Sequence, residues 1–366
     1  MNKKCSLQIF LLGLLFVFAL QVYLPARELK TPAEECRYTK YSQHEEIARF
    51  LSYLDDFSPE VSVQAIGKTK ETRILPPREL LLVIINEEKA ASPETINRGK
   101  PTLLIIASQH GNEQSAKEAA LRLARDIALG ELRPLLKRVN FLIIPQANPY
   151  GNWLDQRRNE QELDLNRDHV KLESEEVRAI HRVFRAWMPE VTLDVHERGD
   201  NYYRVALGCV SNVNINPGLQ EYSHQKILAE VAQNLEKKQV AFYEYLVTDD
   251  LVEEPAAAIG YRKEDLVGVN ETKRYSTTDL NDGRNSFGIY ESLSFIQEGA
   301  SRHDIKTLED RTGWQYQGVR SFVEAVARHG EEIMTMVRES RERLLEKAKT
   351  PAMDDLVHLW MVFARD

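Results

Sequence analysis

Two short stretches of the sequence place histidines where a metal ion could be bound. His110 and Glu113 follow the apolar run 103–107 and are three residues apart, close enough to reach one ion if Gly111 allows a tight turn. His196 follows a second apolar run, 83 residues after Glu113. Two neighbouring ligands and one remote ligand suit a catalytic zinc ion, which keeps its fourth position open, so we expect one zinc ion per chain. Taken singly, each motif is also compatible with a helix cap or a structural histidine.

Further groups that could act on a substrate lie in a charged loop and after a later apolar run. Arginine presents a planar fork to carboxylates, so Arg167 could hold a substrate carboxylate, and Arg158 could polarise a carbonyl or stabilise an oxyanion. The same loop is also compatible with a surface network of ion pairs. A lone glutamate, Glu298, follows the apolar run 293–296.

Strand and helix patterns alternate along the chain, which favours an α/β fold with a mostly parallel, mixed open sheet and helices on both faces. Strands are expected at 61–66, 80–85, 103–107, 141–145, 191–195 and 293–296, and helices at 42–54, 114–129, 174–187 and 223–238. The polar stretch 246–282 is expected to be rich in loops. Open parallel sheets bind ligands at the carboxyl ends of their strands, where His110, Glu113, His196 and Glu298 are all expected.

The two ends of the chain differ in composition from its middle. Lys3 and Lys4 precede the uncharged run 6–24, so residues 1–26 are expected to be a signal peptide or an uncleaved N-terminal membrane anchor. The rest of the protein is then exported, to the periplasm or the extracellular space. A linker is expected at 27–40, the main domain at 41–330 and a C-terminal helical extension at 331–366.

Net charge and cysteine content narrow the classes of partner. The net charge is −8, so the chain has no general electrostatic attraction for nucleic acid, and no nucleic-acid partner is expected. Cys36 and Cys209 both follow the apolar run and could pair in an exported protein, but their spacing matches no metal motif and does not decide the question.

In their order along the chain, these motifs resemble the zinc carboxypeptidase family, the metallopeptidases related to carboxypeptidases A and B. The resemblance extends from about residue 41 to residue 330 and includes Asn148-Pro149-Tyr150-Gly151, which is similar to the family's NPDG turn. It implies a zinc carboxypeptidase-like fold for this domain.

The resemblance also implies a role for each candidate residue. His110, Glu113 and His196 match the zinc ligands, and Asp164 matches the carboxylate that orients the first histidine. Asn166 and Arg167 match the pair that binds the substrate carboxylate. Arg158 matches the arginine at the substrate carbonyl, with Arg157 as the alternative if the register slips, and Glu298 matches the general base.

Some positions depart from the family pattern and leave specificity open. Tyr275 lies 23 residues before Glu298, where the family has a mobile substrate-binding tyrosine, but Tyr290 is also near. Asp282 is placed only approximately for the base of a pocket that would select basic side chains. The sequence Asp-Val-His-Glu at 194–197 differs from commoner versions after the histidine.

The resemblance implies hydrolysis of the C-terminal amide bond of peptides, cell-wall peptides among them, by a zinc-activated water and a glutamate base. The partner is then a peptide or peptide-like substrate with a free C-terminal carboxylate. One alternative is a deacylase of N-acyl amino acids of the desuccinylase type. Another is a membrane-anchored binding protein without catalysis, which the presence of Glu298 and all three metal ligands disfavours.

Overall fold

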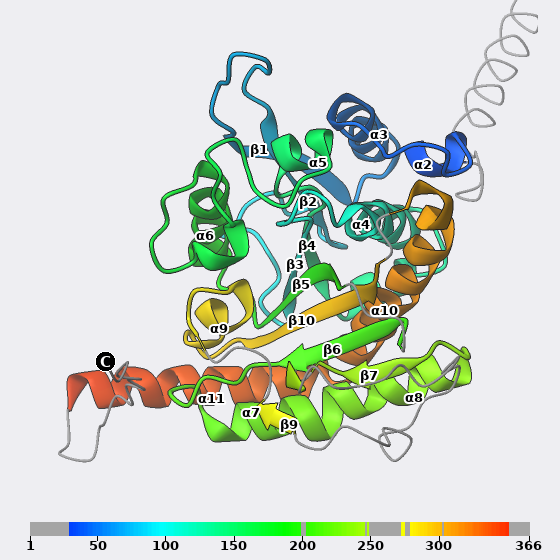
Figure 1. Ribbon diagram of the computed structural model, residues 1–366. Coiled ribbons are helices and arrows are strands. Elements are labelled where there is room, and N and C mark those ends of the chain that lie inside the picture. Colours follow the sequence, from blue (N-terminus) through cyan, green and yellow to red (C-terminus); the bar gives the residue numbers. More distant parts are fainter. Residues whose placement is uncertain are drawn as a thin grey trace, which may run out of the picture.

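The computed structural model describes residues 29–198, 203–245, 247–248, 272–274, 279–301 and 304–350. Its centre is an eight-stranded sheet with the order β1-β2-β4-β3-β5-β10-β6-β7 (Figure 1). These strands are β1 (Val61–Lys68), β2 (Glu79–Ile85), β3 (Thr102–Ala107), β4 (Asn140–Ile144), β5 (Val191–Arg198), β6 (Val205–Cys209), β7 (Phe242–Glu244) and β10 (Leu293–Ala300). A second sheet pairs β8 (Val247–Thr248) with β9 (Thr272–Arg274).

The helices lie between and after these strands. They are α2 (Pro32–Glu35), α3 (His44–Phe57), α4 (Gln114–Ala128), α5 (Pro149–Leu154), α6 (Glu175–Trp187), α7 (Pro217–Tyr222), α8 (Ala229–Lys237), α9 (Gly283–Gly288), α10 (Leu308–Arg328) and α11 (Gly330–Lys349). A π-helical turn, Ser223–Leu228, joins α7 to α8. The helix expected at 223–238 therefore begins earlier, because Asn216 caps a helix whose first residue is Pro217.

The sheet is mixed, with its parallel part at the centre. The strands β4, β3, β5 and β10 run parallel to their neighbours in this group. The pairs β1–β2, β2–β4 and β10–β6 are antiparallel. The expected open α/β sheet is thus confirmed, and its central strands bring their carboxyl ends to one edge.

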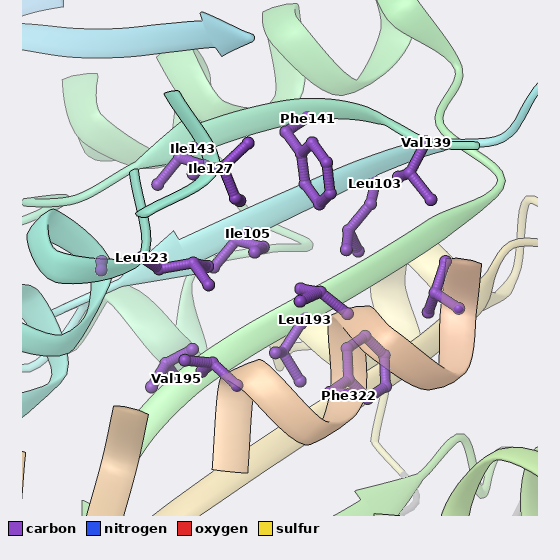
Figure 2. Close-up of a cluster of buried hydrophobic side chains, with 14 of the residues drawn as sticks. Leu103, Ile105, Leu123, Ile127, Val139, Phe141, Ile143, Leu193, Val195 and Phe322 are labelled. Carbon is purple, nitrogen blue, oxygen red and sulfur yellow. The ribbon is translucent and has the colours of Figure 1, made fainter. Parts of the chain in front are cut away.

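Alternate residues of the central strands build two cores, one on each face of the sheet. Figure 2 shows the first, in which side chains of β3 and β5 meet α4 and α10: Leu103, Ile105, Leu193 and Val195 with Leu123, Ile127 and Phe322. The intervening residues of β3 and β4 belong to a second cluster with α6 and α9: Leu104, Ile106, Leu142 and Ile144 with Ile180, Phe184 and Phe287. Helices cover both faces, so these strands are apolar throughout rather than alternating.

Two strands extend further than their apolar runs suggest. The strands β5 and β10 continue to Arg198 and Ala300, in parallel register, so that Glu298 pairs with His196. Both residues lie inside strands, near their carboxyl ends, and not beyond the ends as expected. The reason is that β10 pairs with β5 up to Arg198 and with β6 up to Gly299, and these backbone partners sustain both strands even where their side chains are polar.

The beginning of the chain lies outside the described residues up to residue 28, including the run 6–24. Within the ranges given above, no helix combines the length and apolar composition needed to cross a membrane. The N-terminal segment expected to direct export stays a prediction.

The expected C-terminal extension starts with a helix that packs on the domain. Ile333 and Val337 of α11 are buried in the first core. Arg341 donates hydrogen bonds to the backbone carbonyls of Met188 and Pro189. The first half of α11 is therefore part of the packed body, and residues 351–366 lie outside the described part.

The two cysteines that could have paired are both free thiols. Cys36 follows α2 at the surface, whereas Cys209 is buried in β6. They do not form a disulfide in this structure.

Candidate active site

A tight turn between β3 and α4 places His110 and Glu113. A Cβ atom at Gly111 would lie 2.0 Å from the backbone carbon of Gly151, so only glycine allows α5 to approach this turn. Asn152 of α5 donates a side-chain hydrogen bond of 2.7 Å to the Gly111 carbonyl. The Asn-Pro-Tyr-Gly segment therefore supports the turn that carries the first two candidate ligands.

His110, Glu113 and His196, the ligand cluster, bring their side chains together at the edge of the sheet. The Glu113 carboxylate lies 2.7 Å from His110 Nδ1 through Oε1 and 2.8 Å from His196 Nδ1 through Oε2. The two Nδ1 atoms are 3.1 Å apart, and one donor atom from each residue falls within 4.8 Å of the others. Two imidazoles and a carboxylate converging in a buried place are a donor set that fits zinc.

The outer nitrogens of both histidines contact carboxylates. His110 Nε2 lies 3.0 Å from Asp164, and His196 Nε2 lies 2.8 Å from Asp194. The Asp194 carboxylate also accepts a 2.7 Å hydrogen bond from Gln109. Burial favours the neutral acid, but His196 and Gln109 outweigh it and lower the pKa of Asp194. Such contacts fix the orientation of both imidazole rings, so that their Nδ1 atoms face the Glu113 carboxylate.

Asp194 and Gln109 are site residues that the sequence analysis missed. A signal for Asp194 was present, because it is a lone charged residue in an apolar strand, two positions before His196 and hence on the same face. Gln109 gave no comparable signal, since a polar residue is ordinary where a strand ends.

Glu298 lies on β10 directly beside His196 on β5. Its side chain is 7% exposed. Burial raises the pKa of Glu298 to about 7, the nearby Glu113 acts in the same direction, and His196 opposes both. A carboxyl with a pKa near neutrality can both accept and donate a proton at physiological pH.

The two adjacent arginines of the charged loop have different surroundings. Arg157 Nη1 lies 3.2 Å from His110 Nδ1 and 3.8 Å from Glu113, and its Nε donates to Asp164 at 2.9 Å. Arg158 instead donates to the backbone carbonyl of Glu162 at 3.1 Å. The structure therefore places Arg157 at the ligand cluster and corrects the preference for Arg158. The reason is that the acidic partner, Asp164, reaches only the first of the two side chains.

Asn166 and Arg167 lie on the far side of His196 from Glu113. Asn166 Nδ2 is 3.3 Å from His196 Nε2, and Asn166 Oδ1 accepts a 2.8 Å hydrogen bond from the backbone N–H of Gly283. Arg167 Nη1 donates to the Asn166 carbonyl, and its side chain is exposed rather than buried. An exposed guanidinium next to the cluster is open to a substrate carboxylate.

The candidate substrate tyrosines separate in space. Tyr275 lies outside the described residues. Tyr290 packs on Phe184 at the opposite end of β10 from Glu298, so it does not reach the site. Tyr245, which the sequence analysis missed, lies close enough to Glu298 that this carboxylate is the main cause raising the Tyr245 pKa.

Asp282 does not form a binding group at the base of a pocket. It caps α9, accepting a 2.7 Å hydrogen bond from the backbone N–H of Asn285, and it pairs with Arg284 at 3.4 Å. The suggestion that it selects basic side chains is wrong for this arrangement, because its oxygens already serve the helix and the arginine.

The contacts of Glu197 explain why the residue after His196 departs from the family pattern. As the next residue in β5, it points to the opposite face and accepts a hydrogen bond from Ser115 and one of 2.5 Å from Arg311 of α10. Its backbone N–H donates to Glu113 at 3.1 Å. This residue therefore braces the ligand cluster from behind.

Comparison with known proteins agrees with this geometry. Residues 47–186 match the family model for zinc carboxypeptidase. Carboxypeptidase 2 of Trichophyton rubrum is 24% identical over 228 residues, which cover 57% of this chain and 38% of that protein. The chain thus spans well under half of the relative's length.

Solved structures share the fold. A metallo-carboxypeptidase from Burkholderia cenocepacia aligns with a TM-score of 0.55 at 20% identity, over 79% of this chain and 70% of that one. A metallo-carboxypeptidase from Pseudomonas aeruginosa, in complex with (2-guanidinoethylmercapto)succinic acid, aligns with a TM-score of 0.56 at 19% identity, over 81% and 71%.

The family model covers His110, Glu113 and the charged loop but ends before His196 and Glu298. The sheet places His196 and Glu298 at the same edge as His110 and Glu113. The family is zinc-dependent, and the donor set described here fits that metal. Residues 47–186 thus match a zinc carboxypeptidase domain, and the chain shares its fold with solved metallo-carboxypeptidases.

Proposed function

We propose that this protein is a zinc carboxypeptidase that hydrolyses the C-terminal amide bond of peptides with a free terminal carboxylate. The observation that carries the proposal is the position of Glu298, which is paired in register with His196 and thus stands beside the ligand cluster. A binding protein has no need of a buried carboxylate at that place, whereas a hydrolase needs a base there.

Each residue of the site has a task in this reaction. Zinc held by His110, Glu113 and His196 would supply Lewis acidity, activating water and polarising the scissile carbonyl. Glu298 accepts the proton of the attacking water and passes it to the leaving amine. Arg157, whose guanidinium lies against the ligand cluster, donates to the oxygen that becomes negative.

The terminal carboxylate is recognised by Asn166 and Arg167. The Arg167 guanidinium is exposed beside the site, and a carboxylate is the natural partner of its fork. Recognition of this group restricts cleavage to the last peptide bond, because an internal bond has no carboxylate at that distance. A C-terminally amidated peptide lacks the charge and should therefore be a poor substrate.

The test is hydrolysis of one peptide in free-acid and amidated form, with zinc, with a chelator, and after zinc is restored. We expect turnover of the free acid alone, loss of turnover with the chelator and its return with zinc. Equal kcat/KM for the two forms would exclude the role of Arg167. Binding of the free acid without any turnover would favour the non-catalytic alternative.

The range of substrates is a second part of the proposal. The same protein should be assayed on short cell-wall peptides and on N-succinyl amino acids, which carry an acyl amide next to a free carboxylate. Faster turnover of the N-acyl amino acids would move the protein to the deacylase alternative.

We also propose that the domain works outside the cytoplasm, with the N-terminal segment as its signal or anchor. The support is the uncharged run 6–24 after Lys3 and Lys4. Fractionation of cells producing the full chain, with and without residues 1–26, tests this. Retention of both forms in the cytoplasm would contradict it.

A further inference from the structure

A chain of buried polar side chains continues outward from the carboxylate behind His196. Asp194 Oδ2 lies 2.8 Å from His196 Nε2 and accepts a hydrogen bond of 2.7 Å from Gln109 Nε2. Gln109 Oε1 lies 2.9 Å from His169 Nε2, and His169 Nδ1 lies 3.0 Å from His181 Nε2 of α6. The hydrogen-bond chain thus leads from a candidate metal ligand to α6 through four buried residues: Asp194, Gln109, His169 and His181.

The Asp194 carboxylate fixes the direction of every hydrogen bond in this chain. A carboxylate only accepts hydrogen bonds, so the Gln109 amide turns its NH2 group to Asp194 and its oxygen to His169. His169 must then donate from Nε2. In a neutral imidazole the other nitrogen is an acceptor, so His169 Nδ1 accepts from His181 Nε2.

Both imidazoles of the chain are neutral in the folded protein. Burial, followed by the neighbouring His181, lowers the pKa of His169 to about 3. Burial also lowers the pKa of His181, to about 4. The Phe287 ring packs against both, with its centroid 5.4 Å from that of His169 and 5.1 Å from that of His181. Neither ring therefore takes up a second proton near pH 7, and the direction of the chain is kept.

The same chain determines which nitrogen of His196 is free for a metal ion. Gln109 and His196 contact the same oxygen of Asp194, so the Gln109 amide helps to set where that oxygen lies. At 2.8 Å this oxygen is nearer to His196 Nε2 than the Asn166 amide nitrogen, at 3.3 Å, and it can only accept. His196 therefore carries its hydrogen on Nε2, which leaves the lone pair of Nδ1, facing Glu113, for the metal ion.

The start of α9 packs closely against the middle of the chain. A Cβ atom at Gly283 would lie 3.0 Å from Asp194 Oδ2, 3.1 Å from Gln109 Nε2 and 3.3 Å from His169 Nε2. Only the backbone of a glycine fits there without displacing these groups. The side chains of the hydrogen-bond chain therefore have little room for another arrangement.

We propose that His169 is a positioning residue of the metal site. It holds the Gln109 amide in the orientation that places the Asp194 oxygen against His196. An apolar residue at position 169 would leave the buried Gln109 oxygen without this hydrogen bond, and the amide would lose its fixed orientation. His181 anchors the outer end of the chain. This inference rests on the zinc site of the proposed function.

The test is zinc affinity, measured without substrate by competition with a chromogenic chelator. His169→Leu removes the donor to Gln109 and should lower the affinity roughly three- to tenfold, less than the roughly 10–100-fold typical of groups that contact a metal-bound histidine directly. His169→Gln keeps an N–H donor and should stay within about twofold of wild type. His44→Leu is the matched control, because His44 also contacts a glutamine oxygen, that of Gln146 at 2.9 Å, but outside the hydrogen-bond chain.

The comparison of the variants separates positioning from a merely structural role. A structural histidine would change the melting temperature of both His169 variants and leave the zinc affinity of the folded protein unchanged. Wild-type affinity in folded His169→Leu, or equal losses in His169→Leu and His169→Gln, would overturn the inference. If His169→Leu does not fold, His169→Phe, which keeps a ring against Phe287 but has no donor, takes its place with the same expectation.

The imidazole proton–nitrogen correlation spectrum of the full-length, histidine-labelled protein tests the direction of the chain. With and without zinc, His169 and His181 should be neutral and carry their hydrogens on Nε2; a hydrogen on His169 Nδ1 would overturn the inference. If the wild-type protein binds no zinc, the proposed function fails, and the spectrum decides the positioning role alone. His169→Leu should then still move the His196 resonances, whereas His44→Leu should not, and unmoved His196 resonances would contradict the role of His169.

Discussion

The two sides of the candidate site differ in how their charges are balanced. On the side of the ligand cluster, each histidine lies between two carboxylates, so that Glu113, Asp164 and Asp194 neutralise and orient the two rings. On the other side, Arg198 lies over the Tyr245 ring, 5.3 Å from its centroid, and Asp282 both caps α9 and pairs with Arg284. The first side is therefore built of buried groups that contact one another, whereas the second side includes Arg167, whose side chain is exposed.

Two buried carboxyl groups of the site, those of Glu113 and Glu298, also differ in their surroundings and hence in their pKa. Burial alone raises the pKa of both Glu113 and Glu298, because it penalises the charged form. Contact with His110 and His196 reverses this effect and holds the pKa of Glu113 well below its usual range. Glu298 makes no such direct contact with the two rings within the described part of the chain, and its pKa stays raised, to about 7. One carboxyl is therefore a permanent anion, and the other can exchange a proton.

The largest effect on catalysis is expected when the Glu298 carboxyl can no longer take a proton. Glu298→Gln keeps the shape of the side chain, so zinc content and melting temperature should stay near those of wild type. The loss should fall on kcat, by roughly 10²–10⁴-fold, as for a general base. Zinc content, melting temperature and kcat should be measured on one preparation. A folded, zinc-loaded variant with near-normal kcat would remove Glu298 from the mechanism.

The adjacent arginines give the next largest contrast. Arg157→Gln should lower kcat by roughly 10²–10³-fold, because a donor to the developing oxyanion is lost. Arg158→Gln is its matched control and should keep kcat within about threefold, since Arg158 binds the Glu162 carbonyl and not the cluster. Steady-state kinetics on the free-acid peptide separates them. A larger loss with Arg158→Gln would restore the original assignment.

A third change tests how completely the ligand cluster is held by its surroundings. Asp194→Asn removes the charge next to His196 Nε2, and zinc affinity should fall roughly 10–100-fold, as for other outer partners of metal-bound histidines. Competition with a chromogenic chelator measures this affinity. Asp56→Asn, at an exposed position of α3, should leave the affinity unchanged. Wild-type affinity in Asp194→Asn would show that the contact does not orient the ring.

The sequence alone indicated the three candidate metal ligands and Glu298, although not Asp194 and Gln109, because the signals of the first four are local. His110 and Glu113 lie in one turn, and the apolar runs before His196 and Glu298 fix strands whose ends must meet at one edge of a parallel sheet. The alternation of strand and helix likewise follows from short-range patterns of apolar residues. These features need no knowledge of distant contacts.

The arrangement around Tyr245 and Arg284 could not be derived in the same way. Arg284 comes near Tyr245 only because β6 pairs with β10 and Gly208 leaves space between them, which no local pattern records. The choice between Arg157 and Arg158 depends on which side chain reaches Asp164. The end of β5 depends on backbone partners in β10 rather than on its own residues. Each of these features is set by tertiary contacts.

The smallest expected effect concerns a third buried carboxyl, that of Glu176. It extends the comparison of Glu113 with Glu298, because the neighbour of Glu176 is another acid, Glu160. Glu176 of α6 is fully buried and lies beneath the loop that carries Arg157, where Asn159 donates to it at 3.1 Å. Burial, followed by the nearby Glu160, raises the pKa of Glu176 to about 8 from an ordinary value of 4.5. The folded protein then binds more protons than the unfolded chain, so this contribution to stability is complete below about pH 4.5 and is lost as the pH rises through about 8.

Glu176→Gln cannot ionise, so its melting temperature relative to wild type should rise by about 2–4 °C between pH 5 and pH 8. Scanning calorimetry at these pH values measures the difference, with Glu173→Gln, at an exposed position before α6, as the control. A difference between variant and wild type that does not change with pH would mean that Glu176 is ionised in the folded protein, as Glu113 is.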